Sequence, residues 1–417
     1  MKKTLTLVLA ILLIALTMVA CGSSEPPAQE PSVPPEEPVA EPSAPEPESV
    51  QITIWHENDA VIADTIQQQL AGIPGVNVTL ERKEQMSDAL KMVGNDPNSA
   101  PDMYLFAHDK IGVFAEMGIL APVIDLLPPD AFANILPMAI DATTYKGNQY
   151  SAPLYFETLL FMYNKDLMAT PPATTDELLD LMENGTTANS YVFAEQHSTA
   201  YYAAAWIQGF GGYIINENAE PGLGSNEVID AMTYHKSFIP YMPLDGEYNT
   251  VTTLFSEGMA ASTIGGPWMV PGLRDVGMNL GISTMPVLPN GNPLTPFSGI
   301  QAVQVLNHAA TAKQEAVEKV LAALLDPEVG IALAKAANCA PVNILAYDDP
   351  EVSSNEMIIV MRDTAANVIP MPNVPEMDVM WTVTDNMLAS INKNNQDVAS
   401  TCEGAQTEAI DLIEAMQ

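Results

Sequence analysis

Strand-like and helix-like segments alternate along the chain from residue 50 onward, and this alternation limits the folds that are open to it. Period-two runs rich in β-branched and aromatic residues predict strands, and helical patterns stand between them. In order, the predicted elements are a strand at 51–55, a helix at 64–70, a strand at 76–80, a helix at 88–93 and a strand at 102–107. This pattern is typical of an α/β domain with a mainly parallel sheet. The length of 417 residues predicts two or three domains.

The same alternation continues further along the chain. Thr174 and Glu177 form the sequence pattern of a capping box and predict a helix start. Further strands are predicted at 259–264, 280–284 and 303–306, and further helices at 201–206, 311–325, 328–337 and across most of 377–417.

Polar loops that carry aromatic residues follow two of the predicted strands. They cover 55–59 and 106–110. Because ligands of open α/β sheets bind at the carboxyl ends of the strands, we expect both loops to lie at one ligand-binding edge.

The first twenty residues have the pattern of an export signal. Lys2 and Lys3 precede the uncharged, mostly apolar run 4–20, and Cys21 follows a small residue. The junction resembles a bacterial lipobox, which predicts a signal peptide at 1–20 and lipidation of Cys21. A transmembrane anchor is the alternative for the apolar run.

The next segment, 22–49, has the composition of an extended tether. It contains nine Pro and seven Glu, and no Lys, Arg or aromatic residue. Such a sequence cannot bury apolar surface and favours polyproline II, with a reach of about 90 Å when fully extended. We interpret it as a stalk, and a proline-rich ligand for another protein is the alternative.

The charge balance and the missing motifs exclude several classes of function. The chain has 52 acidic residues against 15 Lys plus Arg, a net charge of −37, so nucleic-acid binding and docking on anionic lipid are excluded. No phosphate-binding loop, zinc-hydrolase or serine-hydrolase motif occurs, so we expect no cofactor and no metal. Cys339 and Cys402 remain after Cys21, and their pairing is left open. A glycoside hydrolase with paired carboxylates is the enzymatic alternative, although the sequence selects no pair.

From residue 50 to the C-terminus, several ordered blocks carry a family resemblance. They include ITIWHEND, PDMYLFAHDK, YFETLLFMYNKDL, GGPWMV and MPNVPEMDVMW. The chain resembles the extracellular solute-binding proteins of sugar ABC importers, among them the maltose/maltodextrin-binding proteins. The resemblance implies a type II periplasmic-binding-protein fold, in which two α/β lobes, each with a mainly parallel sheet flanked by helices, hold the ligand in the cleft between them. The implied lobes are 50–156 with 302–350, and 157–301 with 351–417.

The resemblance also implies which residues contact sugar. Carboxylates accept hydrogen bonds from hydroxyls, and flat rings cover the apolar faces of a sugar. The implied hydroxyl acceptors are Asp59, Asp109 and Glu157, the implied stacking rings are Tyr201, Trp268 and Trp381, and Phe106 and Lys110 lie beside them. Taken alone, the two Trp residues are also consistent with a core position, Asp109 with a helix cap and Glu157 with a solvated hinge.

Several positions depart from the pattern of the family. They are Ala60 and Thr199 in place of charged residues, Phe106 in place of a Trp, Lys110 in place of an Arg, Asp385 in place of an Arg, and the larger Leu160. The stacking rings are thus kept more completely than the polar contacts.

The function implied is that of a monomeric, non-enzymatic receptor, lipid-anchored on the outer face of the bacterial cytoplasmic membrane. It would bind maltodextrin in a hinged cleft and deliver it to the transmembrane subunits of an ABC permease. Two non-enzymatic alternatives are a receptor of the same class for a different oligosaccharide and a cell-surface adhesin for starch.

Overall fold

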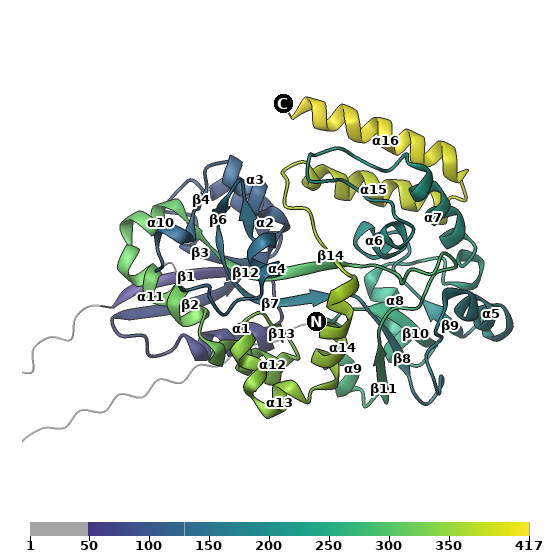
Figure 1. Cartoon of the computed structure of the whole chain (residues 1–417), viewed down its shortest axis with the longest axis horizontal. Helices are drawn as coiled ribbons and strands as arrows, with labels where there is room; N and C mark the ends of the chain where they lie inside the picture. Colours follow the sequence, from purple (N-terminus) through teal and green to yellow (C-terminus); the bar gives the residue numbers. More distant parts are fainter. Residues whose placement is uncertain (1–48, 129, 417) are drawn as a thin grey trace, which may run out of the picture. The chain divides into compact units, whose positions relative to one another are not determined.

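The computed structural model describes residues 49–128 and 130–416, whose helices and strands are drawn in Figure 1. The predicted signal peptide, the predicted lipidation site Cys21 and the predicted tether up to residue 48 lie outside the described residues. Within the described part, no helix has the length and apolar character needed to cross a membrane. The first element, β1 (Val50–His56), coincides with the first predicted strand.

The larger sheet has the strand order β13–β7–β12–β3–β1–β2, and β4 and β14 also pair with β12. β1 runs parallel to β2 and β3, whereas β12 runs antiparallel to β3 and β7. In addition to β1, its strands are β2 (Val76–Arg82), β3 (Met103–Ala107), β4 (Leu120–Ala121), β7 (Ser151–Thr158), β12 (Phe297–Leu306), β13 (Ala340–Pro341) and β14 (Ile369–Pro370).

The smaller sheet has the order β11–β8–β10–β9. β8 runs antiparallel to both β10 and β11, and β10 runs parallel to β9. Its strands are β8 (Leu160–Asn164), β9 (Tyr191–Ala194), β10 (Ala260–Gly265) and β11 (Leu280–Ser283), and a separate hairpin pairs β5 (Thr144–Tyr145) with β6 (Asn148–Gln149).

The prediction of mainly parallel sheets is wrong, because both sheets are mixed. Crossover helices return the chain to the same end of the sheet, so β1, β2 and β3 run in one direction. β7 instead leads into β8 of the smaller sheet after the single residue Leu159, and β12 brings the chain back beside β7. Strands that leave and return in this way run in opposite directions.

The predicted lobe boundaries fall inside these two crossing strands. The division at 156/157 lies within β7 and that at 301/302 within β12, so each strand would belong to both lobes. β14 is a fourth strand that pairs with β12, beside β3, β4 and β7, and the Met371 amide donates to the Ser298 carbonyl at 3.1 Å. Chain segments far apart in sequence thus meet along β12.

Helices flank both sheets, as Figure 1 shows. In chain order they are α1 (Ala60–Gln69), α2 (Met86–Val93), α3 (Ile111–Glu116), α4 (Pro137–Ala142), α5 (Thr175–Gly185), α6 (Ala200–Gly209), α7 (Asn226–Lys236), α8 (Tyr248–Ser256), α9 (Val270–Asp275), α10 (Asn307–Ala312), α11 (Gln314–Leu324), α12 (Pro327–Ala337), α13 (Pro350–Ser353), α14 (Glu356–Thr364), α15 (Met377–Asn392) and α16 (Val398–Ala415). Short 3-10 helices are η1 (His108–Lys110), η2 (Val123–Asp125), η3 (Ile239–Tyr241), η4 (Pro267–Met269), η5 (Ile344–Asp348) and η6 (Ala365–Asn367).

The capping box predicted at the start of α5 is confirmed. The Glu177 amide donates to the Thr174 hydroxyl at 3.1 Å, and the Glu177 carboxylate accepts from the Thr174 amide. This pairing satisfies backbone donors that have no partner inside the helix.

The single helix predicted over 311–325 is divided into α10 and α11 at Lys313. Lys313 has φ −130° and ψ 29°, and its ammonium group lies 2.7 Å from Asp102 Oδ1 and 2.8 Å from the Gln51 carbonyl oxygen. Because the apolar spacing continues through the break, the sequence pattern did not predict it.

The disulfide that the sequence left open is not formed. Cys339 and Cys402 are both free and buried, and they belong to different hydrophobic clusters. Burial raises the pKa of both thiols, that of Cys402 to about 12.

Candidate functional site

Two of the predicted carboxylates and one of the predicted rings line a single pocket, here called the central pocket. These are Asp59, Glu157 and Trp268, and the other lining residues are Val61, Ile62, Tyr155, Pro267, Pro271, Ala337 and Cys339. Asp59 is exposed at the N-cap position of α1 and makes no side-chain capping bond there. Its carboxylate is therefore available to a ligand.

Glu157 lies near the end of β7, where the chain leaves the larger sheet. Gln301 on the neighbouring β12 donates to Glu157 Oε1 at 2.8 Å. Burial raises the pKa of Glu157 to about 7, against the opposing effect of this hydrogen bond. The side chain keeps partial exposure, so it can meet a ligand in the central pocket.

The three predicted stacking rings, Tyr201, Trp268 and Trp381, lie together in a row of half-buried rings. The Tyr201 ring centroid lies 6.3 Å from that of Trp268 and 6.5 Å from that of Phe297, and Phe297 lies 6.0 Å from Trp381. The backbone of Gly266 lies against the Trp268 ring, because a Cβ added at Gly266 would lie 2.2 Å from atoms of the indole. Only glycine therefore lets the Trp268 ring lie across the backbone here.

Tyr201 connects this row to the carboxylates. Burial raises its pKa well above the ordinary value, and the nearby charges of Glu157 and Asp109 add to the shift. Carboxylates and rings that were assigned from distant blocks of sequence thus lie in one region.

Lys110 is committed to carboxylates that come from two parts of the chain. Its ammonium nitrogen lies 2.8 Å from Asp378 Oδ1 and 3.3 Å from Asp109 Oδ2, and Lys91 lies 2.5 Å from the other Asp378 oxygen. Burial opposes protonation of Lys110, but the two carboxylates outweigh it and raise its pKa. Asp378, in the first turn of α15, was not predicted as a partner.

His108 joins the segments that meet along β12. The Ile300 amide donates to His108 Nδ1 at 3.0 Å, and Nε2 lies 2.8 Å from the Met371 carbonyl oxygen. Since Nδ1 accepts, Nε2 must carry the proton and donate. The imidazole continues the hydrogen bonding of the sheet where β3 ends and turns into η1.

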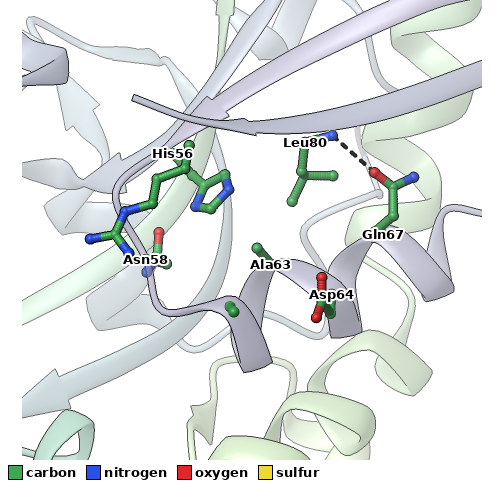
Figure 2. A pocket seen from close by; sticks show the side chains of 8 residues that line it. His56, Asn58, Ala63, Asp64, Gln67 and Leu80 are labelled. Carbon is green, nitrogen blue, oxygen red and sulfur yellow. Dashed lines mark hydrogen bonds between the residues drawn. The ribbon is translucent and has the colours of Figure 1, made fainter. Parts of the chain in front are cut away.

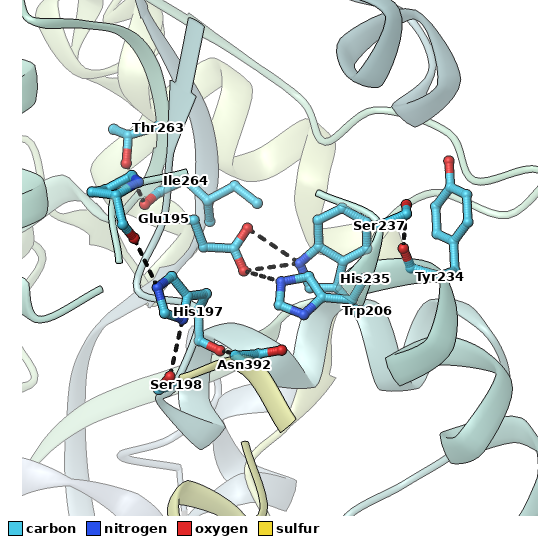
Figure 3. Close-up of polar contacts among 11 residues, drawn as sticks. Glu195, His197, Ser198, Trp206, Tyr234, His235, Ser237, Thr263, Ile264 and Asn392 are labelled. Atoms are coloured by element: carbon cyan, nitrogen blue, oxygen red, sulfur yellow. Dashed lines mark hydrogen bonds and ion pairs between the residues drawn. The ribbon is translucent and has the colours of Figure 1, made fainter. Parts of the chain in front are cut away.

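Asp385 and Glu195 hold α6, the helix that carries Tyr201. Asp385 Oδ1 accepts from the Ala200 amide at 2.6 Å. Asp385, which departs from the family pattern, thus provides an acceptor for the first backbone N–H of α6. Glu195 is fully buried and accepts from Trp206 Nε1 at 3.0 Å, and His235 Nε2 lies 3.2 Å from the same oxygen (Figure 3).

One predicted ring, Phe106, lies apart from the row, and two residues that were not predicted, Phe297 and Tyr155, lie at the site. Phe106 is half-buried and packs against the cluster around Trp55 and Tyr104, so it is not part of the ring row. Phe297 is 2% exposed and supports the row from behind, while the Tyr155 hydroxyl accepts from Asn58 at 2.8 Å beside the central pocket. Tyr155 begins the sequence block YFETLLFMYNKDL, but the residue types of Tyr155 and Phe297 alone gave no reason to choose them.

The pH dependence of stability is expected to report on Glu157. Because its folded pKa is about 7 and its ordinary value is 4.5, the folded state retains a proton that the unfolded chain has lost between these values. Its contribution to stability therefore falls as the pH rises through this window. Glu157→Gln removes the effect, so the variant should gain about 1–2 kcal/mol relative to the wild type between pH 5 and pH 8. Urea unfolding at both pH values measures this, and parallel pH profiles of the two proteins would contradict it.

The arrangement suits a neutral, hydroxyl-rich ligand. Carboxylates provide acceptors for hydroxyls, and a row of rings covers apolar C–H faces. Across residues 49–128 and 130–416, no three His, Cys, Asp or Glu side chains gather in a way that could hold a metal ion.

Comparison with known proteins places the chain among binding proteins. A family model described as bacterial extracellular solute-binding protein matches residues 62–358. The maltotriose-binding protein of Pyrococcus abyssi is 29% identical over 87% of this chain and 82% of that protein. The maltooligosaccharide ABC transporter solute-binding lipoprotein of Streptococcus pneumoniae is 27% identical over 98% of this chain and 96% of its own length.

A solved structure of a cyclo/maltodextrin-binding protein complexed with maltotetraose has a TM-score of 0.78 and 21% identity, and the match covers 90% of this chain and all of that one. This likeness confirms the predicted two-lobe α/β binding-protein fold. The family is one of binding proteins, so the prediction that the chain is not an enzyme is also confirmed. The chain belongs to the family of bacterial extracellular solute-binding proteins.

Proposed function

We propose that this protein is the receptor of an ABC importer and binds a malto-oligosaccharide between its two lobes. The observation that carries the proposal is the row of half-buried rings, Trp268, Tyr201 and Trp381 with Phe297 behind them, beside the carboxylates of the central pocket. The names of two relatives, which bind maltotriose and maltooligosaccharide, support the choice of sugar.

In this proposal the carboxylates and the aromatic rings have different roles. Asp59, Asp109 and Glu157 accept hydrogen bonds from hydroxyls, and Tyr201, Trp268 and Trp381 stack on the rings of successive sugar units. Phe106 and Lys110 act from behind, because Phe106 packs into the core and Lys110 is paired with Asp109 and Asp378.

The mechanism proposed is closure of the two lobes, 50–156 with 302–350 and 157–301 with 351–417. A closed form contacts the sugar from both lobes, whereas an open form contacts it from one, so binding shifts the population toward closure. The closed form then docks on the transmembrane subunits of the permease. The charge of −37 disfavours a phosphorylated ligand, because few cations are available to bind one.

The proposal includes attachment to the membrane by a lipid on Cys21. An apolar signal followed by a small residue and Cys, and a relative named as a lipoprotein, support it. Two or three acyl chains anchor a protein far more firmly than a single chain does. The protein would act as a monomer at the outer face of the bacterial cytoplasmic membrane, carried on the tether 22–49.

Isothermal titration with a panel of oligosaccharides tests the proposal. Maltotriose and longer malto-oligosaccharides should release heat and raise the melting temperature, while isomeric sugars of other linkages should do so weakly. Hydroxyls that donate to Glu157 favour its ionised form, so binding near pH 7 should also release a fraction of a proton. Titrations in buffers of different ionisation enthalpy measure this release. Absence of binding across the panel would refute the malto-oligosaccharide assignment.

A further inference from the structure

A second pocket, here called the outer pocket, lies between the start of α1 and the ends of β1 and β2 (Figure 2). Its lining residues are His56, Asn58, Ala60, Ala63, Asp64, Gln67, Leu80 and Arg82. The four that come from α1 are spaced as i, i+3, i+4 and i+7, so they share one face of the helix. The pocket is therefore built from one helix face and two strand ends.

The outer pocket contains a buried polar atom without a partner. His56 is 5% exposed, and its Nδ1 takes part in no hydrogen bond among the described residues. A buried nitrogen without a partner destabilises the fold unless a ligand or solvent molecule meets it. Burial lowers the pKa of His56, so the ring is neutral at pH 7 and offers one donor and one acceptor, the capacity that a hydroxyl group matches.

The charged groups of the outer pocket are also uncommitted. Arg82 is exposed, and neither Arg82 nor Asp64 takes part in an ion pair within the part of the chain that the structure describes. Gln67, by contrast, is occupied, since it donates to the Val78 carbonyl at 2.6 Å and accepts from the Leu80 amide at 2.9 Å. Figure 2 shows the bond to Leu80 at the inner wall of the pocket. Gln67 thus belongs to the fold, whereas the charged pair remains for a ligand.

These groups favour a neutral polyhydroxyl ligand over an anion. The Arg82 guanidinium at the end of β2 can donate to ligand hydroxyls and the Asp64 carboxylate on α1 can accept from them, while Asp64 would repel an anion held by Arg82. Ala60, Ala63 and Leu80 supply a small apolar surface for C–H groups. This is the combination that a sugar unit needs.

The outer pocket adjoins the central pocket across the first turn of α1. Asn58 and Ala60 line the outer pocket, while Asp59, Val61 and Ile62 line the central one. Asn58 also donates to the hydroxyl of Tyr155, which lines the central pocket. Ala60 is exposed and carries only a methyl group, so the path over the helix start is not blocked by a long side chain.

We propose that the outer pocket binds one further sugar unit of an oligosaccharide whose other units occupy the central pocket. The pocket would thereby set the chain length that the protein prefers. This inference rests on the proposed function, because it assigns a place to one end of the same ligand.

A chain-length series tests the inference on the full chain. Titration with maltose through maltoheptaose should show one step at which affinity rises about fivefold or more, and Arg82→Gln and Asp64→Asn should each remove that step. Affinity for the oligosaccharides shorter than the step should stay unchanged. Arg362→Gln is the matched control, because Arg362 is an exposed arginine remote from both pockets in sequence and paired with Asp363. It should leave the whole series as in the wild type.

NMR spectroscopy of the unpaired His56 nitrogen tests the inference directly. The ¹⁵N signal of His56 Nδ1 should move when an oligosaccharide longer than the step is added, and should stay in place with shorter ones. Arg82→Gln and Asp64→Asn effects that are equal at every length, or absent, would overturn this inference alone. If no malto-oligosaccharide of any length binds, the proposed function fails and this inference fails with it.

Discussion

Replacing Trp268 with alanine is expected to weaken binding of malto-oligosaccharide by about 30-fold or more. Trp268 lines the central pocket from η4, and its half-buried ring adjoins that of Tyr201 at 6.3 Å. An aromatic side chain at the centre of a contact surface typically accounts for about 2 kcal/mol or more of binding free energy. At 1.4 kcal/mol for each factor of ten, that corresponds to about 30-fold in the dissociation constant. Isothermal titration with maltotriose measures it.

Two further variants separate stacking from general damage. Trp268→Phe keeps a flat apolar face and should lose much less affinity. Trp55→Phe changes a Trp that packs in the cluster behind Phe106, outside the lining of the central pocket, and should leave affinity nearly unchanged. If Trp268→Ala binds maltotriose as the wild type does, the ring row is only a hydrophobic core and the proposed site is wrong.

Replacing Glu195 with alanine is expected to cost about 2–5 kcal/mol of folding free energy, because each buried donor left without a partner costs about 1–3 kcal/mol. Glu195 has no exposed surface, and its carboxylate accepts from Trp206 and lies 3.2 Å from His235 Nε2, as Figure 3 shows. Its removal leaves two buried N–H groups without an acceptor. Urea unfolding followed by tryptophan fluorescence measures the loss.

The matched control is Glu315→Ala. Glu315 is exposed and pairs with Lys319 one helical turn away, and such exposed ion pairs contribute little to stability. Glu195→Gln should fall between the two variants, because its amide oxygen can still accept from both N–H groups but is a weaker, uncharged acceptor, and its NH₂ group replaces the oxygen that lies 3.3 Å from Trp206 Nε1. Equal stability of the Glu195→Ala and Glu315→Ala proteins would show that the buried contacts contribute nothing.

The fold class followed from the sequence because local patterns survive in the structure. β1, β2 and β3 and the helices between them lie where alternation predicts them, and the capping box at Thr174 marks the start of α5. Strand direction was not predictable in this way. It depends on which strands carry the chain between the two sheets, and nothing local distinguishes β7 or β12 from a strand with a crossover helix.

The candidate site was predictable from the sequence where a rare residue type, such as tryptophan, has few possible roles. Trp268 and Trp381 lie in distinctive sequence blocks that predicted a role for their rings, and the structure brings both half-buried rings into one row. Asp378 was missed because an acid in a chain with 52 of them carries no signal until Lys91 and Lys110 are found beside it. The break at Lys313 was missed for the same reason, since its partners lie far away in sequence.

The contacts of His108 couple the candidate site to the crossing strands. One ring nitrogen accepts from Ile300 on β12 and the other lies against the Met371 carbonyl, while the next residue in the chain is Asp109. A change in the path of β12 must therefore displace the imidazole and, through one peptide bond, the Asp109 carboxylate. Conversely, a ligand that fixes Asp109 also restricts the paths open to β12. The imidazole of His108 thus ties β12 and the segment at Met371 to the residue that precedes Asp109.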